Sequence, residues 1–127
     1  MNFEKVVFGF FIVLAATMNL GFFVGDPLDP AQHNAYQLFA AIVVSIIATI
    51  LKFGDRTQLG AVHLATSLVA DVELIVAAFV WVWGEYISTA GMTPAVVSLV
   101  VSISGGALLA NLISVVFLVT ETVAIRR

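Results

Sequence analysis

Asp71 and Glu73 are two acidic residues in the middle of a long apolar stretch. They are the only charged residues between Arg56 and Glu85. An ionisable side chain at the centre of a membrane-spanning helix costs about 2.5–3.5 kcal/mol on insertion scales, so such residues are usually functional. We therefore predict that Asp71 and Glu73 bind an ion or a proton. The alternative is that both acids are neutral and form only structural hydrogen bonds.

The composition of the whole chain indicates an integral membrane protein. Of its 127 residues, 61% are hydrophobic and 10% are charged, whereas soluble domains have about 45–50% and about 25%. Five Lys and Arg residues are too few for the basic face of a nucleic-acid-binding protein. There is no cysteine, and no phosphate-binding loop, zinc-ligand spacing or nucleophile–base motif is present. We expect no enzyme activity, no cofactor and no nucleic-acid partner, while metal binding stays open.

The hydropathy pattern predicts an all-α, polytopic membrane protein with one domain over residues 1–127. A helix of about 20 apolar residues crosses the hydrocarbon core of a bilayer. Four such stretches are present, at about 6–24, 30–52, 56–83 and 94–125. Typical helix-start residues precede the last three, namely Asp29-Pro30, Asp55 and Thr93-Pro94. The fourth stretch is longer than a bilayer requires, so we expect it to tilt, to kink at residues 104–106, or to project.

All five basic residues fall on one side of this four-span arrangement. They are Lys5, Lys52, Arg56, Arg126 and Arg127. Because Lys and Arg favour the cytoplasmic side of a membrane, we predict that both termini are cytoplasmic. The Trp and Tyr residues should line the opposite membrane interface, and they are Tyr36, Trp81, Trp83 and Tyr86. We expect His33 and Glu121 to be solvated near the two membrane surfaces.

The spacing of the two acids predicts that they leave their helix on opposite sides. Two residues correspond to about 200° of rotation around an α-helix. A helix in an isolated four-helix bundle has one buried face and one lipid face, so a homo-oligomer or a partner membrane protein should cover the second acid. Within the chain, Asn111 is the strongest candidate hydrogen-bond partner because it lies at a similar depth. Ser45, Thr17 and Asn19 are weaker candidates.

Two further patterns concern polar and small residues. His63, Ser67 and Asp71 are four residues apart and could form a water-linked polar track along one side of a helix. The alternative for His63 is a histidine that only packs between helices. A stripe of small residues in the last span should allow close helix packing, within one subunit or between subunits. The stripe consists of Ser98, Ser102, Gly106, Ala110 and Ser114.

Three resemblances to known families accompany these patterns. The overall pattern over most of the chain resembles small four-span inner-membrane proteins of bacteria that have no assigned function. The resemblance is strongest at residues 52–61, Lys-Phe-Gly-Asp-Arg-Thr-Gln-Leu-Gly-Ala. This resemblance implies a bacterial inner membrane and no mechanism. The run Asp71-Val72-Glu73, followed by Trp81 and Trp83, resembles a short segment of a membrane subunit of respiratory complex I. By size the chain resembles the small multidrug resistance transporters, whose essential acid lies in the first span, where this chain has none.

The leading functional hypothesis is an oligomeric inner-membrane channel or transport protein for protons or monovalent cations. Asp71 would be the mid-membrane site, and Glu73 would be a second site or an interface acid. One alternative is a non-transporting accessory subunit that uses the acids to bind a partner helix in a larger membrane complex. Another alternative is a proton-coupled exporter of small cationic compounds. All three place the protein in a lipid bilayer.

Overall fold

The structure, a computed structural model, describes residues 3–54 and 57–126. It contains four long helices, each long and apolar enough to cross a membrane. They are α1 (Phe3–Phe23), α2 (Ala35–Lys52), α3 (Gln58–Val82) and α4 (Pro94–Arg126). A short 3-10 helix, η1 (Pro30–Gln32), precedes α2, and a π-helical turn, η2 (Trp83–Ile87), follows α3. The described residues contain no β-strand, so the predicted all-α, four-span fold is confirmed.

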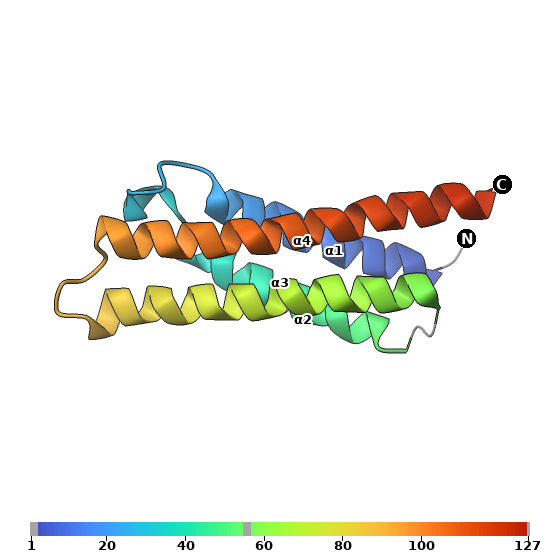
Figure 1. The fold of residues 1–127 in the computed structure, drawn as a ribbon, viewed down its shortest axis with the longest axis horizontal. Coiled ribbons are helices and arrows are strands. Elements are labelled where there is room, and N and C mark those ends of the chain that lie inside the picture. Colours follow the sequence, from blue (N-terminus) through green and yellow to red (C-terminus); the bar gives the residue numbers. More distant parts are fainter. Residues whose placement is uncertain (1–2, 55–56, 127) are drawn as a thin grey trace.

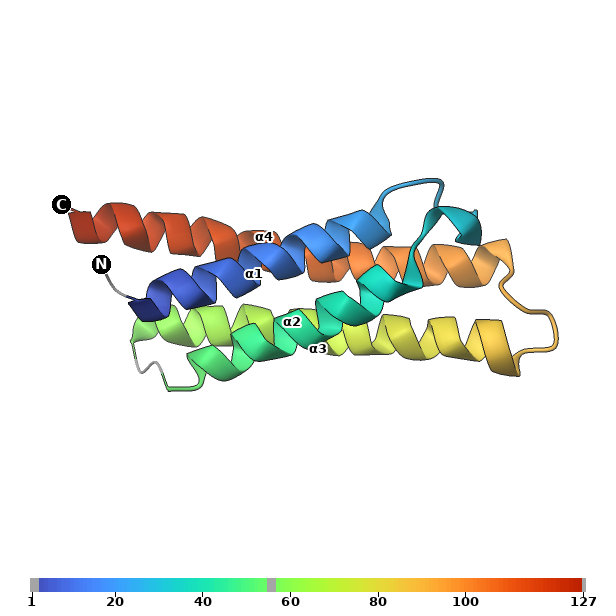
Figure 2. The same cartoon turned by 180° about the vertical axis from the view of Figure 1, so that it is seen from behind.

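The four long helices lie side by side along the long axis of the molecule (Figure 1). The start of α1, the end of α4 and the α2–α3 connection lie at one end, which we call the terminal end. The connections α1–α2 and α3–α4 lie at the opposite end, which we call the loop end (Figure 2). Helix α3 packs against α2 and α4, and α1 packs against the same two helices. Each helix therefore has two neighbours within the chain.

Two predicted helix starts can be compared with the structure. Pro94 begins α4, and the Thr93 hydroxyl oxygen accepts a hydrogen bond from the Val96 amide at 3.3 Å, so that prediction is confirmed. The predicted start of the second span at Asp29-Pro30 is wrong, because these residues begin only the single turn η1. Helix α2 begins five residues later, after Asn34. Asp55 lies outside the described residues.

Helix α4 is continuous through the two adjacent glycines that could have kinked it. Its 33 residues correspond to about 50 Å, well above the thickness of a hydrocarbon core. Figure 1 shows that its last turns extend beyond the other helices at the terminal end. The expected kink at residues 104–106 is therefore absent, while tilt in a bilayer stays a prediction.

The buried apolar residues form two separate cores. The loop-end core is the larger and consists of Phe22, Leu38, Ala41, Ala70, Leu74, Ala77, Ala78, Trp81, Val100, Ala107 and Ala110. The terminal-end core consists of Phe8, Ile12 and Ala48. Trp81 is buried with its ring 5.6 Å from that of Phe22 in an edge-to-face arrangement, so it packs inside the bundle, while its position at a membrane interface stays a prediction. Tyr36, Trp83 and Tyr86 are exposed.

His33 connects the two ends of the α1–α2 loop. Its Nδ1 atom lies 2.6 Å from the Phe22 carbonyl oxygen, and its Nε2 atom lies 2.8 Å from the Asp26 carbonyl oxygen. The ring is buried, so the prediction of a solvated His33 is wrong. Both partners are acceptors, so a ring N–H of His33 ties the loop to the end of α1 or to Asp26, depending on the nitrogen that carries the hydrogen.

Replacing His33 with Leu should destabilise the bundle. The Phe22 or Asp26 carbonyl group would lose its donor, which costs about 1–3 kcal/mol in the free energy of unfolding for a buried group. Thermal unfolding in detergent measures this loss. Tyr36→Phe is a matched control, because Tyr36 lies close by in the sequence and is exposed. Equal melting temperatures for His33→Leu and the control would contradict a structural role for the ring.

Candidate functional site

Asp71 lies on α3 with its side chain directed toward α2. Ser45 Oγ donates a hydrogen bond to Asp71 Oδ1 at 2.6 Å, and Thr49 Oγ1 lies 2.5 Å from Asp71 Oδ2. Ser45 and Thr49 are one helical turn apart, so their hydroxyl groups share one face of α2. Only 7% of Asp71 is exposed. Both oxygens of this carboxyl group are therefore held by hydroxyl groups inside the bundle.

The hydrogen bonds around Thr49 accommodate a protonated Asp71. The Thr49 hydroxyl oxygen also lies 3.0 Å from the Ser45 carbonyl oxygen, and a hydroxyl group has only one hydrogen to donate. A protonated Asp71 can donate to Thr49 Oγ1, and the Thr49 hydrogen is then available to the Ser45 carbonyl. A neutral carboxyl group also avoids the cost of burying a charge. The arrangement is chemically suited to hold a proton.

The sequence-predicted partners of Asp71 lie in different positions. Ser45 is a direct neighbour, whereas Asn111 and Asn19 are fully buried and have no hydrogen-bond partner among the described residues. Thr17 is exposed and donates to the Leu14 carbonyl of its own helix at 2.8 Å. Thr49 was missed, although its position one turn after Ser45 was a usable signal. The preference for Asn111 over Ser45 is therefore wrong.

Glu73 is directed toward α4 rather than α2. Its carboxylate lies against Gly106, where a side-chain carbon on the glycine would overlap with Glu73 Oε2. The two acids thus leave α3 on different sides, as their spacing predicts. Helices α2 and α4 of the same chain lie beside α3 on these sides. Glu73 is only partly buried, so the cover of the second acid by a homo-oligomer or a partner membrane protein stays a prediction.

The predicted polar track along α3 is buried over its full length. His63, Ser67 and Asp71 all lie inside the bundle. The Ser67 hydroxyl, like the Asn19 and Asn111 amides, has no hydrogen-bond partner among the described residues. Buried polar groups of this kind are usually satisfied by ordered water or a ligand. The track therefore passes through a polar region of the bundle interior.

His63 ends the track on the side of the terminal end. Its ring centroid is 5.1 Å from that of Phe8 and 6.3 Å from that of Phe117, with edge-to-face geometry in both cases. His63 Nε2 also lies 3.6 Å from Glu121 Oε2, and Glu121 forms an ion pair with Lys5. Only 13% of the Glu121 side chain is exposed, so the prediction of a solvated Glu121 is wrong. His63 both packs between helices and contacts an acid.

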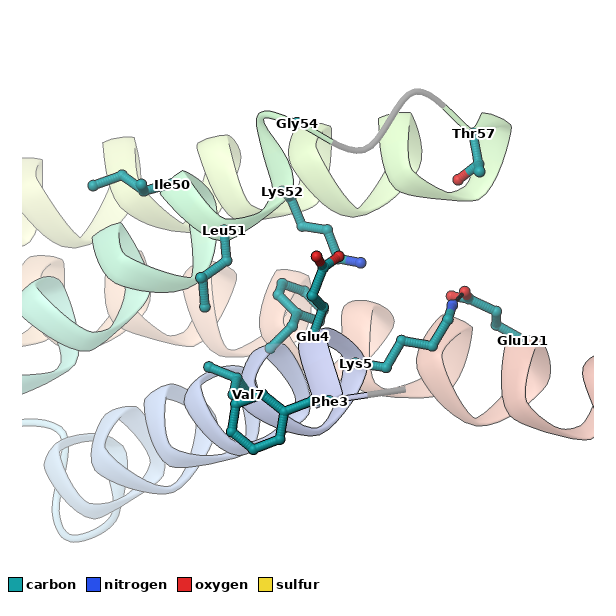
Figure 3. A pocket seen from close by; sticks show the side chains of 11 residues that line it. Phe3, Glu4, Lys5, Val7, Ile50, Leu51, Lys52, Gly54, Thr57 and Glu121 are labelled. Carbon is teal, nitrogen blue, oxygen red and sulfur yellow. Dashed lines mark ion pairs between the residues drawn. The ribbon is translucent and has the colours of Figure 1, made fainter. Parts of the chain in front are cut away.

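A pocket of about 820 Å³ opens at the terminal end beside this cluster. Its lining comes mainly from α1 and α2 and includes Phe3, Glu4, Lys5, Val7, Phe8, Ile50, Leu51, Lys52, Gly54, Thr57 and Glu121. Figure 3 shows that the Glu4 carboxylate points toward the Lys52 amine and that Lys5 reaches Glu121. The Lys52 amine also lies 4.3 Å from the centroid of the Phe8 ring. Phe8 therefore contacts both the pocket and His63.

The small-residue stripe of α4 does not form a single interface. Ala110 and Ser114 are buried, and Ser114 shares a hydrogen bond with the Thr66 hydroxyl of α3. Gly106 contacts Glu73, but Ser102 is exposed and Ser98 is only partly buried. Residues four apart drift by about 40° per step around an α-helix, so the stripe turns away from the interior. Only its second half packs within the chain.

Comparison with known proteins gives one family match. The sequence profile of DUF6394, a family of unknown function, matches residues 32–122. The matched region covers more than half of the chain and includes Ser45, Thr49, Asp71 and Glu73. No curated protein and no solved structure matches the chain significantly.

Proposed function

Because the chain belongs to the DUF6394 family, whose function is unknown, we propose a function from the geometry around Asp71. The protein is a membrane proton transport protein, and Asp71 is its proton-binding residue. The observation that carries this proposal is the buried carboxyl group of Asp71, whose two oxygens are held by the hydroxyl groups of Ser45 and Thr49 in an arrangement that accommodates a protonated carboxyl group. Glu73, against Gly106 on α4, is proposed as a second proton site.

The same geometry favours a proton over a metal cation. The hydroxyl oxygens of Ser45 and Thr49 lie 2.6 and 2.5 Å from the Asp71 oxygens. These distances suit hydrogen bonds between the oxygens themselves. An ion bound between them would need its own distance of about 2.0–2.6 Å to each oxygen, which would push the oxygens apart. Within the described residues, no group of three His, Cys, Asp or Glu side chains could hold a metal ion.

The proposed proton route runs from the terminal end to Asp71. Glu121 and His63 lie 3.6 Å apart at the start of the route. Ser67 and then Asp71 follow, each one helical turn further along α3, with a rise of about 6 Å per step. Water molecules bound to the otherwise unpartnered amide and hydroxyl groups of the interior would bridge these steps. Each such group has several hydrogen-bonding positions to offer.

The loop-end core closes the route beyond Asp71. Leu74, Trp81 and Phe22 belong to this core, and they are too apolar to conduct a proton. This conformation therefore corresponds to a site open only toward the terminal end. Transport across the membrane would require a second conformation in which the loop-end core separates.

We further propose that the terminal end faces the cytoplasm of a bacterial cell, because Lys5 and Lys52 lie there and all five basic residues fall on one side of the four-span arrangement in the sequence. The loop end carries Asp26, Asp29 and Glu85, which fits the opposite side of an inner membrane. Helices of the same chain lie beside both acids, so each subunit of a homo-oligomer would contain its own proton route.

Proton flux in proteoliposomes tests the proposed function. Purified protein is reconstituted with a pH-sensitive dye inside, and a potassium diffusion potential drives protons inward. We expect acidification faster than in protein-free liposomes. A rate equal to that of protein-free liposomes would overturn the proposal. Copurification of a second membrane protein that is required for stability would instead support the accessory-subunit alternative.

Replacing His63 with Phe should slow this flux by at least tenfold. A phenyl ring can pack between Phe8 and Phe117 as the imidazole does, but it cannot take up or release a proton, a contribution typically worth about 10²–10⁴-fold in proton transfer. The dye assay measures the rate, and thermal unfolding verifies the fold. Thr120→Ala, an exposed position on α4 one residue before Glu121, is the control. Wild-type flux in a folded His63→Phe protein would exclude His63 from the route.

A further inference from the structure

The pocket at the terminal end has the features of a binding site for an amphipathic molecule. We propose that it binds the headgroup of a zwitterionic phospholipid that carries a phosphate and a primary ammonium group. An acyl chain of the same lipid would lie along the apolar side of the pocket. This inference does not depend on proton transport.

The position and shape of the pocket suit a lipid. It lies where α1 begins and α2 ends, which is the depth of the headgroups for helices that just span the hydrocarbon core. Its volume of about 820 Å³ is within the usual range of small-molecule sites. Phe3 and Ile50 on its lining are 75% and 62% exposed, so an apolar surface continues from the pocket onto the outside of the bundle.

The charges of the pocket come in opposite pairs. Lys5 forms an ion pair with Glu121, and Figure 3 shows Glu4 directed toward Lys52. Only 5% of Lys52 is exposed, and its amine is held against the Phe8 ring. A phosphate group bound to Lys52 would draw this lysine away from Glu4, and an ammonium group on the same headgroup would compensate Glu4. A zwitterion therefore offers a negative charge to Lys52 and a positive charge to Glu4 at the same time.

The opposite charges of Lys52 and Glu4 also distinguish between lipid classes. An anionic headgroup such as phosphoglycerol can contact Lys52, but it offers no positive charge to Glu4. Glu4 is exposed, so its carboxylate can accept a charge-assisted hydrogen bond from an ammonium group at the pocket rim. A choline headgroup has a positive charge but no N–H group to donate. Ethanolamine provides both, so phosphatidylethanolamine should bind best.

Thermal unfolding of the full-length protein in mild detergent tests the proposal. Dioctanoyl phosphatidylethanolamine at saturation should raise the melting temperature by about 5 °C. Three comparison probes each lack one group of this lipid. Dioctanoylglycerol has the acyl chains but no phosphate, and inorganic phosphate has no acyl chains. Dioctanoyl phosphatidylglycerol has the phosphate and the chains but no ammonium group. Each should give a clearly smaller rise. An equal rise with dioctanoylglycerol would overturn the headgroup site, and an equal rise with phosphatidylglycerol would overturn its zwitterionic class.

Two variants locate the effect in the pocket. Lys52→Gln should lose most of the rise, whereas Tyr36→Phe at the loop end should retain it. Glu4 is exposed, so Glu4→Gln should fold even if Lys52→Gln does not, and it should lower the preference for phosphatidylethanolamine over phosphatidylglycerol. An unchanged rise in Lys52→Gln, or an unchanged preference in Glu4→Gln, would overturn the assignment of the headgroup to these residues.

Discussion

Asp71→Asn is expected to abolish proton flux while the protein remains folded. An Asn side chain can accept from Ser45 and donate to Thr49, as a protonated Asp71 does, but it cannot release a proton. The hydrogen bonds at 2.6 and 2.5 Å should therefore survive the change. In the dye assay we expect a rate at the level of protein-free liposomes. The free energy of unfolding should fall by less than about 1 kcal/mol.

Two companion variants make this result specific. Ser102→Ala changes an exposed polar position on α4 and should leave the flux unchanged. Glu73→Gln removes the second acid without touching Ser45 or Thr49, and it should also lower the flux if both acids carry protons. Wild-type flux in a folded Asp71→Asn protein would exclude Asp71 as the proton-binding residue.

Thr49→Val should cause the second-largest effect, on stability and on flux together. Valine has the shape of threonine but no hydroxyl group, so Asp71 Oδ2 would lose the partner that lies 2.5 Å away. A buried polar group left without a partner costs about 1–3 kcal/mol. The flux should fall because a protonated Asp71 has lost its acceptor. Chemical denaturation in detergent and the dye assay measure the two effects.

The chain offers a matched control for the loss of a threonine hydroxyl. Thr17 is exposed on α1 and donates only to its own helix, so Thr17→Val should change neither quantity. Thr49→Ser keeps the hydroxyl and should retain most of the stability and flux. If Thr49→Val and Thr17→Val behave alike, the contact between Thr49 and Asp71 has no role in the function.

Most of the fold could be predicted, because hydropathy and helix-start residues are signals that depend only on residues close together in the sequence. The four spans and the start at Pro94 depend on nearby residues only. The start of α2 was predicted five residues early, because the same cap-and-proline signal also begins a single 3-10 turn. The burial of Trp81 and His33 could not be read from the sequence, since both contact Phe22, a residue of another helix.

The residues of the site that lie on α3 could be predicted, but their neighbours on other helices could not. The position of Asp71 within an apolar span identified it, and the rotation between Asp71 and Glu73 followed from helix geometry. Which helix each acid faces depends on how the neighbouring helices are rotated and shifted against α3. Spacing within one helix does not encode that arrangement. Thr49 and Glu121, which belong to α2 and α4, were therefore missed as neighbours of Asp71 and His63.

The position of Asp71 close to the middle of α3 (Gln58–Val82) has an electrical consequence. If the membrane potential falls evenly along α3, a proton that reaches Asp71 from the terminal end crosses about half of the transmembrane voltage. One charge that crosses 100 mV completely changes its energy by about 2.3 kcal/mol. At 100 mV, half of that crossing changes the ratio of protonated to ionised Asp71 by about sevenfold. Voltage alone would then load or unload the site at constant pH.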